Sequence, residues 1–107
     1  MGCSYCLFSL DKLVEMKSNG TEFWTAAGRN KLRIADIDGK AMRIRLKRMK
    51  AGTLTPWLDY KKLEEIHKRI HTGEIDLTPY QIDEVIPCWG SYITGLLKYL
   101  GCIPELR

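Results

Sequence analysis

The stretch KLRIADIDGKAMRIRLKR, residues 31–48, decides the fold expected for this chain of 107 residues. Apolar and charged side chains alternate on both sides of Gly39, and this alternation is typical of strands with one buried face. Asp38 and Gly39 between the two runs are residues that favour a tight turn. We therefore predict a β-hairpin with one strand from Lys31 to Asp36 and another from Lys40 to Arg48.

The length of the hairpin loop decides which side chains share a face of the sheet. A two-residue loop would mix apolar and charged side chains on both faces, whereas a three-residue loop, Ile37 to Gly39, makes one face uniformly apolar. The longer loop also puts Gly39 where a left-handed backbone is needed. We therefore predict the three-residue loop. Its cross-strand partners are Asp36 and Lys40, Ile34 and Met42, Leu32 and Ile44, Arg33 and Arg43, and Lys31 and Arg45.

Charge is concentrated in the same region. The segment from Arg29 to Lys50 holds nine cations and two anions, or +7, while the other residues hold eight cations and eleven anions, or −3, which gives the net +4. In the predicted register no carboxylate neutralises the cations of the polar face, although salt screens their repulsion beyond about 8 Å. We expect this face to contact the phosphate backbone of DNA or RNA. The predicted contact residues are Lys31, Arg33, Arg43, Arg45 and Lys47.

Helices are expected on both sides of the strands, which include a further strand from Thr21 to Ala27. Ser9 predicts an N-terminal helix cap, and Thr55 followed by Pro56 predicts another. Thr78-Pro79-Tyr80-Gln81 has the pattern of a capping box, and Ser91 is placed to cap a last helix. The predicted fold is a single α+β domain over residues 1–107, in the order αβββααα. Its three-stranded antiparallel β-meander is packed on one face by helices.

The apolar residues of the strands and helices define the expected core. On the sheet it comprises Trp24, Leu32, Ile34, Met42, Ile44 and Leu46. On the helices it comprises Leu63, Ile66, Ile70, Ile82, Val85, Ile93, Leu96, Leu97 and Leu100.

Two helices near the end of the chain carry a family resemblance. The stretch from Leu77 to Ile86, followed by the stretch from Ser91 to Leu100, resembles a helix-turn-helix DNA-binding module of bacterial regulators. The resemblance implies that the second helix reads the major groove. By that analogy the residues facing the groove are Ser91, Tyr92, Thr94, Gly95 and Lys98. The turn from Pro87 to Gly90 is longer than is usual in that family.

Metal and catalytic patterns are weak. Cys3-x-x-Cys6 has the spacing of half a zinc site, but His67 and His71 stand some sixty residues away, against about twelve to fifteen in a zinc finger. No Gly-rich phosphate loop and no nucleophile elbow occurs in the sequence. We expect no metal, no cofactor and no catalytic residues.

Three functions follow as hypotheses. The first is a small, non-enzymatic nucleic-acid-binding accessory or regulatory module that uses the basic sheet face. The second is a protein-interaction or assembly module, either a homodimer or a partner of an acidic protein, and the third is a small-ligand binder lined by tryptophans. No apolar run approaches the roughly 18 residues of a membrane helix, and no secretion signal is recognised. A cytoplasmic protein without membrane contact is therefore expected.

Overall fold

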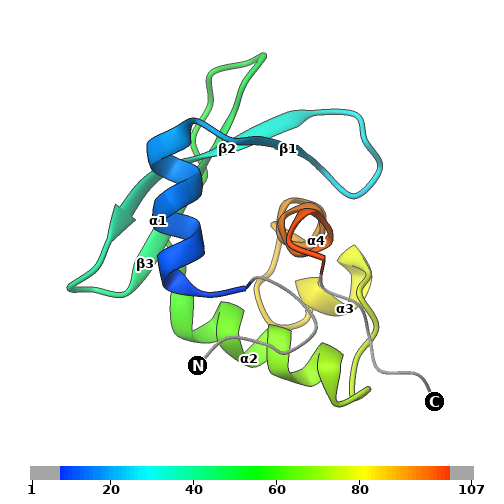
Figure 1. The fold of residues 1–107 in the computed structure, drawn as a ribbon. Coiled ribbons are helices and arrows are strands. Elements are labelled where there is room, and N and C mark those ends of the chain that lie inside the picture. The colour runs from blue at the N-terminus through cyan, green and yellow to red at the C-terminus, as the bar shows by residue number, and fades with distance from the viewer. Residues whose placement is uncertain (1–7, 102–107) are drawn as a thin grey trace.

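A computed structural model describes residues 8–101, which form an α+β fold with an antiparallel sheet (Figure 1). The helices are α1 (Leu10–Asn19), α2 (Tyr60–His71), α3 (Pro79–Asp83) and α4 (Gly90–Tyr99). The strands are β1 (Glu22–Trp24), β2 (Lys31–Asp38), β3 (Arg43–Arg48) and β4 (Leu58–Asp59). They lie in the spatial order β1-β2-β3-β4. The α+β class and the antiparallel sheet confirm the prediction.

The sheet has a fourth strand where a helix was predicted to begin, so the described elements run αββββααα rather than αβββααα. Thr55 is not a helix cap. Its hydroxyl accepts a hydrogen bond from Leu46 N at 3.0 Å, which ties the loop before β4 to β3. Helix α2 begins instead at Tyr60, where the Asp59 carboxylate accepts from Lys61 N at 2.9 Å. The tertiary contact to β3 thus overrides the Thr-Pro start signal.

The predicted hairpin register is wrong. The loop contains four residues, Gly39 to Met42, and Met42 has a left-handed backbone with φ of 53°. A bulge between Ile34 and Asp36 shifts the register within β2, so that Ile34 pairs with Leu46. Beyond the bulge the partners are Asp36 and Arg45, Ile37 and Ile44, and Asp38 and Arg43. Beyond the bulge the observed register places opposite charges across the strands, which is favourable, whereas before it Arg33 still lies opposite Lys47.

The core lies between the sheet and the helices. Side chains of β2 up to Ile34, and of β3 from Arg43 to Lys47, alternate between buried and more exposed positions. This alternation defines an inner face under the helices and an outer face open to solvent. The buried apolar residues include Leu32, Ile34, Ile44 and Leu46 of the inner face. All the predicted helical core residues are buried as well, apart from the partly buried Val85. Met42 is also only partly buried.

Trp24 is the main departure from the predicted core. Phe23 before it is buried, so the alternation of β1 turns Trp24 to the outer face, where it is 51% exposed.

Of the two C-terminal helices, α3 begins with the predicted side-chain cap, whereas α4 has no side-chain cap. Thr78 caps α3, and Pro79 stands in the first turn as predicted. The Gln81 side chain accepts from Asp76 N at 2.7 Å, rather than closing a capping box. Helix α4 begins at Gly90, before the predicted cap Ser91.

Helix α4 approaches β1 closely at Gly95. A Cβ at this position would meet the backbone of Trp24 and would lie 2.9 Å from the Cα of Thr25. Real side chains essentially never make so short a contact, and backbone cannot rotate away as a side chain can. The absence of a side chain at Gly95 is therefore what allows the helix to pack on this strand.

Replacing Gly95 by Ala is expected to lower the free energy of unfolding by about 1–3 kcal/mol, because the methyl group overpacks the contact. Helix propensity alone would favour Ala by about 1 kcal/mol, so the sign of the change tests the contact. Gly39→Ala is the control, since nothing lies within 4 Å of a Cβ there. Urea unfolding measures both, and a Gly95→Ala variant as stable as the parent would contradict the close approach.

A small aromatic cluster joins the start of the described chain to α2. The ring of Phe8 stacks on His67 at 4.6 Å and on Tyr60 at 5.6 Å between centroids. Burial, and secondly the neighbouring charge of His71, lower the pKa of His67 to about 4. The unfolded chain therefore binds more protons than the folded one between pH 6.5 and about 4. Stability contributed by neutral His67 is lost as the pH falls through this window.

The variant His67→Gln is expected to unfold with a weaker pH dependence than the parent between pH 7 and about 4. The parent should lose more of its urea midpoint over this range, because only its unfolded state gains the imidazole proton. Lys68→Gln is the matched control on the same helix and should retain the parental pH dependence. Equal slopes for the parent and His67→Gln would show that His67 titrates normally in the folded state.

Candidate nucleic-acid interface

The outer face of the sheet holds all five predicted phosphate-contact residues. Lys31 and Arg33 of β2 alternate with buried Leu32 and Ile34, and the basic residues of β3 alternate with Ile44 and Leu46. The five side chains therefore share one face despite the wrong register. Sharing a face does not make them equivalent, since carboxylates now reach some of them.

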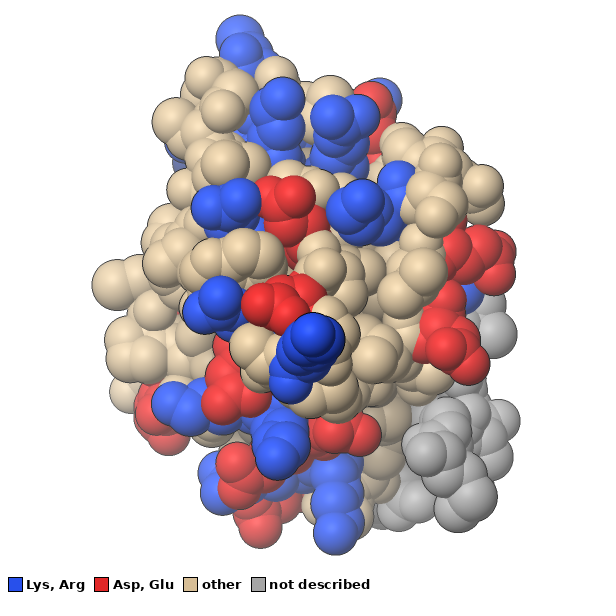
Figure 2. Space-filling view, turned by 90° about the vertical axis from the view of Figure 1, so that its left-hand side faces the viewer, with Lys and Arg blue, Asp and Glu red and all other residues tan. Residues whose placement is uncertain are grey.

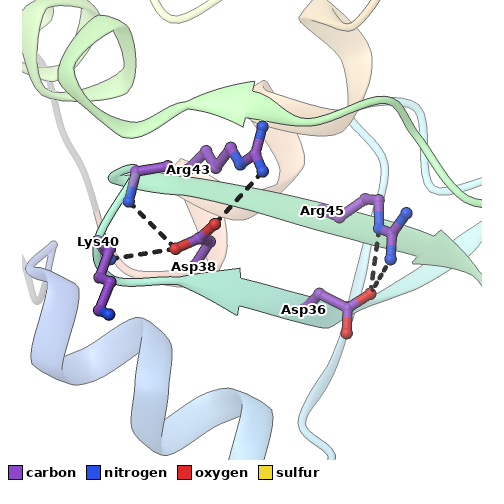
Figure 3. Close-up of polar contacts among 6 residues, drawn as sticks. Asp36, Asp38, Lys40, Arg43 and Arg45 are labelled. Atoms are coloured by element: carbon purple, nitrogen blue, oxygen red, sulfur yellow. Dashed lines mark hydrogen bonds and ion pairs between the residues drawn. The ribbon is translucent and has the colours of Figure 1, made fainter.

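Arg43 and Arg45 are neutralised within the hairpin (Figure 3). Arg45 Nε donates to the Asp36 carboxylate at 3.1 Å, and a second nitrogen of its guanidinium contacts the same oxygen. Arg43 lies 3.3 Å from the Asp38 carboxylate. The expectation that no carboxylate neutralises this cluster is wrong for both arginines, because the bulge aligns each one with an aspartate. It is also wrong for Lys31, whose Nζ lies 3.4 Å from the Glu22 carboxylate.

Asp38 also organises the hairpin loop. Its Oδ1 accepts from the backbone N–H groups of Lys40 and Ala41, each at 3.1 Å (Figure 3). The hydrogen bond from Ala41 is the main cause that lowers the pKa of Asp38, opposed by desolvation and assisted by Lys40 and Arg43. The carboxylate therefore stays ionised at neutral pH and keeps its ion pair.

Trp57 completes this neutral part of the face. The guanidinium carbons of Arg43 and Arg45 lie 4.5 and 4.6 Å from its ring centroid. Cation–π contacts of this kind hold both arginines against the ring. We call this region the paired end. It comprises Lys40, Arg43 and Arg45 with Asp36, Asp38 and Asp59, so its formal charge is three minus three, or zero.

The opposite end of the sheet, toward the β1–β2 and β3–β4 turns, is strongly basic. Arg33 and Lys47 stand directly across from each other, and neither forms an ion pair within residues 8–101. The pairing of β2 with the chain after β3 continues to this end, since Met49 N donates to Lys31 O at 2.9 Å. The guanidinium of Arg48 likewise donates to Asn30 at 3.0 Å.

These contacts define the basic end. Its members are Arg29, Lys31, Arg33, Lys47, Arg48 and Lys50, with Glu22 as the acidic residue among them. Six cations and one anion give a formal charge of +5. Figure 2 shows Lys and Arg predominating toward the top of the face it presents, whereas acidic side chains are interspersed lower down. The fold thus separates a uniform basic sequence segment into a neutral end and a charged end.

Two apolar side chains border the basic end. Trp24 is exposed beside Lys31, whose Nζ lies 5.2 Å from the ring centroid. Leu54 is 47% exposed and forms a β-bridge with Lys47. Sequence reasoning missed Trp24 as a surface residue, and the alternation Glu22-Phe23-Trp24 was the signal that could have identified it.

The other predicted aromatic groups are dispersed. Tyr60 and Phe23 are buried in the core. Trp89 packs partly buried against the core and makes an edge contact with Tyr92 at 5.2 Å. The residues expected to line a small-ligand site are Phe23 and Trp24, Trp57 and Tyr60, and Trp89 and Tyr92. The structure does not bring these three pairs together into one lining.

No three His, Cys, Asp or Glu side chains within residues 8–101 are grouped so that they could hold a metal ion. Cys3 and Cys6, which have the spacing of half a zinc site, lie outside the described residues, as does Cys102. Cys88 is exposed and carries a free thiol.

Helix α4 does not expose all the residues that the helix-turn-helix resemblance assigns to the major groove of DNA. Thr94 and Gly95 are buried, and Gly95 packs against the backbone of Trp24. Helix α3 has five residues. The resemblance stays a prediction, and the basic end lies on the other side of the sheet from this helix pair.

The chain matches no protein-family model, no curated protein and no solved structure at a significant level. Among the described residues, every helix is too short or too polar to cross a bilayer.

Proposed function

We propose that this protein is a small non-enzymatic nucleic-acid-binding module that uses the basic end of its sheet. The observation that carries the proposal is the separation of charge described above, which concentrates +5 around Arg33 and Lys47. Neighbouring like charges raise the local potential and attract a polyanion. Arg33 and Lys47 are the proposed phosphate contacts. Lys31 beside them already lies 3.4 Å from the Glu22 carboxylate, so the prediction that it contacts phosphate is not kept.

Arg43 and Arg45 are assigned a different role from the one expected from the sequence. Each already has a carboxylate partner, so a phosphate would have to displace that partner and would gain less than at an unpaired cation. We assign them to the stability of the hairpin rather than to the ligand. The proposed footprint is therefore smaller than the predicted one.

The proposed contacts place phosphates without specifying sequence. Lys and Arg side chains that meet the backbone fix its position, whereas sequence is read at base edges. Binding of this kind releases counterions, so its affinity falls steeply as the salt concentration rises. Salt dependence is thus the most direct quantitative signature of the proposal.

The double variant Arg33→Gln/Lys47→Gln is expected to bind a labelled oligonucleotide at least about tenfold more weakly at low salt. The slope of log K against log salt should become shallower by about 1.5–2, because two phosphate contacts are removed. Fluorescence anisotropy across a salt series measures both quantities. Lys61→Gln/Lys62→Gln is the matched control, since both lysines are exposed on α2 and the change in net charge is the same.

If both double variants lose the same amount of affinity for the oligonucleotide, the binding depends on the net charge of the protein and not on a defined site. Absence of polynucleotide binding by the parent at low salt would remove the proposal. Co-purification of an acidic protein, or a stable homodimer, would then favour the assembly hypothesis.

Removing the carboxylates that pair with Arg43 and Arg45 gives a second, independent test. Asp36→Asn/Asp38→Asn should tighten oligonucleotide binding and steepen the salt slope by up to about 2, because two guanidinium groups lose their internal counterions. Asn at position 38 keeps a side-chain oxygen for the N–H groups of the loop. The control Asp11→Asn/Glu15→Gln makes the same charge change on α1, and it should have a smaller effect. A slope that does not change would show that Arg43 and Arg45 cannot reach the ligand.

A further inference from the structure

Trp24 is an exposed aromatic ring beside the basic end. It is 51% exposed, and Lys31 Nζ lies 5.2 Å from its ring centroid. An indole on the surface forgoes the stabilisation that burial of so large an apolar group would give. Phe23, which is 2% exposed, is the residue of β1 that packs into the core. Core packing therefore does not explain why a tryptophan stands at position 24.

The backbone that carries Trp24 is held firmly. Thr25 N donates to Asn30 O at 3.0 Å, and Ala26 N donates to Ser91 O of α4, also at 3.0 Å. Gly95 allows α4 to lie directly against this backbone. The indole is thus presented from a fixed segment, so little conformational entropy is lost when a ligand contacts it.

The charges around the ring suit a base attached to a phosphate. Lys31 is the cross-strand partner of Trp24, and Arg33 follows it on the same face of β2. Successive same-face residues stand about 6.6–6.8 Å apart. Glu22 shares this face of β1, and its carboxylate lies 3.4 Å from Lys31 Nζ. The phosphates next to a base on the indole would therefore be contacted further along, by Arg33 and Lys47.

We propose that the ligand of the basic end is a single-stranded nucleic acid with one unpaired base stacked on Trp24. This inference rests on the proposed function and narrows it. In a duplex the bases are already paired and stacked on each other, so they cannot use the ring without unstacking. Stacking tolerates every base because each has a π-face, and it is typical of single-strand binders.

The test compares three ligands of equal length by fluorescence anisotropy: a single-stranded oligonucleotide, its duplex, and a phosphodiester strand of abasic sites. Trp24→Leu should weaken binding of the base-bearing single strand by about 5- to 150-fold, the range expected when one stacked base is lost. Binding of the abasic strand should be unchanged. Trp24→Phe should restore a large part of the lost affinity, because it restores an aromatic face.

Tyr80→Leu is the matched control, since Tyr80 is an exposed aromatic on α3. It should bind all three ligands as the parent does. Circular dichroism and the urea midpoint of Trp24→Leu should equal those of the parent, which excludes unfolding as the cause of a loss.

The outcomes separate this inference from the proposed function. If Trp24→Leu weakens the base-bearing and abasic strands equally, or has no effect, stacking is overturned while phosphate binding stands. Parental binding of duplex as tight as that of the single strand would likewise overturn it. If the parent binds none of the three ligands at low salt, both proposals fall together.

Discussion

The bulge between Ile34 and Asp36 is the constraint on which the outer face depends. Without it, strict alternation would carry Ile37 to the solvent side and Asp36 to the core. With it, Ile37 pairs with Ile44 on the inner face, and Asp36 lies opposite Arg45. The bulge therefore allows both the partial burial of Ile37 and the ion pair between Asp36 and Arg45. It also confines the unpaired cations to the far end of the strands.

The inner face positions the outer one through α4. Gly95 and the hydrogen bond from Ala26 N to Ser91 O fix the end of β1 on this helix. In the turn after β1, the Asn30 side chain accepts a hydrogen bond from the guanidinium of Arg48 at the end of β3. The elements that carry Trp24, Lys31 and the β3 cations are thus tied to one another by backbone and side-chain hydrogen bonds. A binding surface assembled in this way needs little rearrangement when a ligand arrives.

The sequence supplied the fold class, the antiparallel sheet, the caps at Ser9 and Thr78 and most of the core, because these follow from local periodicity and capping chemistry. The register of the β2–β3 hairpin could not be predicted from local periodicity in the same way. The predicted hairpin assumed unbroken alternation, and a bulge violates that assumption at the cost of one unpaired residue. The signal overlooked was electrostatic: two aspartates in one strand face two arginines in the other, and cross-strand pairing of opposite charges is favourable. The strand at Leu58–Asp59 depends on contacts with β3 that no local pattern encodes.

The size of the basic end limits the number of phosphates it can contact, and therefore the affinity for nucleic acid that charge alone can provide. From Trp24 on β1 to Lys47 on β3 the face crosses two inter-strand spacings, about 10 Å. At about 3.4 Å per nucleotide of a stacked strand, this distance covers roughly three phosphates. Neutralising three phosphates of a single strand gives a salt slope of about −2, which is small beside the slope of about −10 seen for large repressors. A chain of this kind would hold its ligand weakly and reversibly by charge alone. A stacked base would then supply the part of the affinity that persists at higher salt.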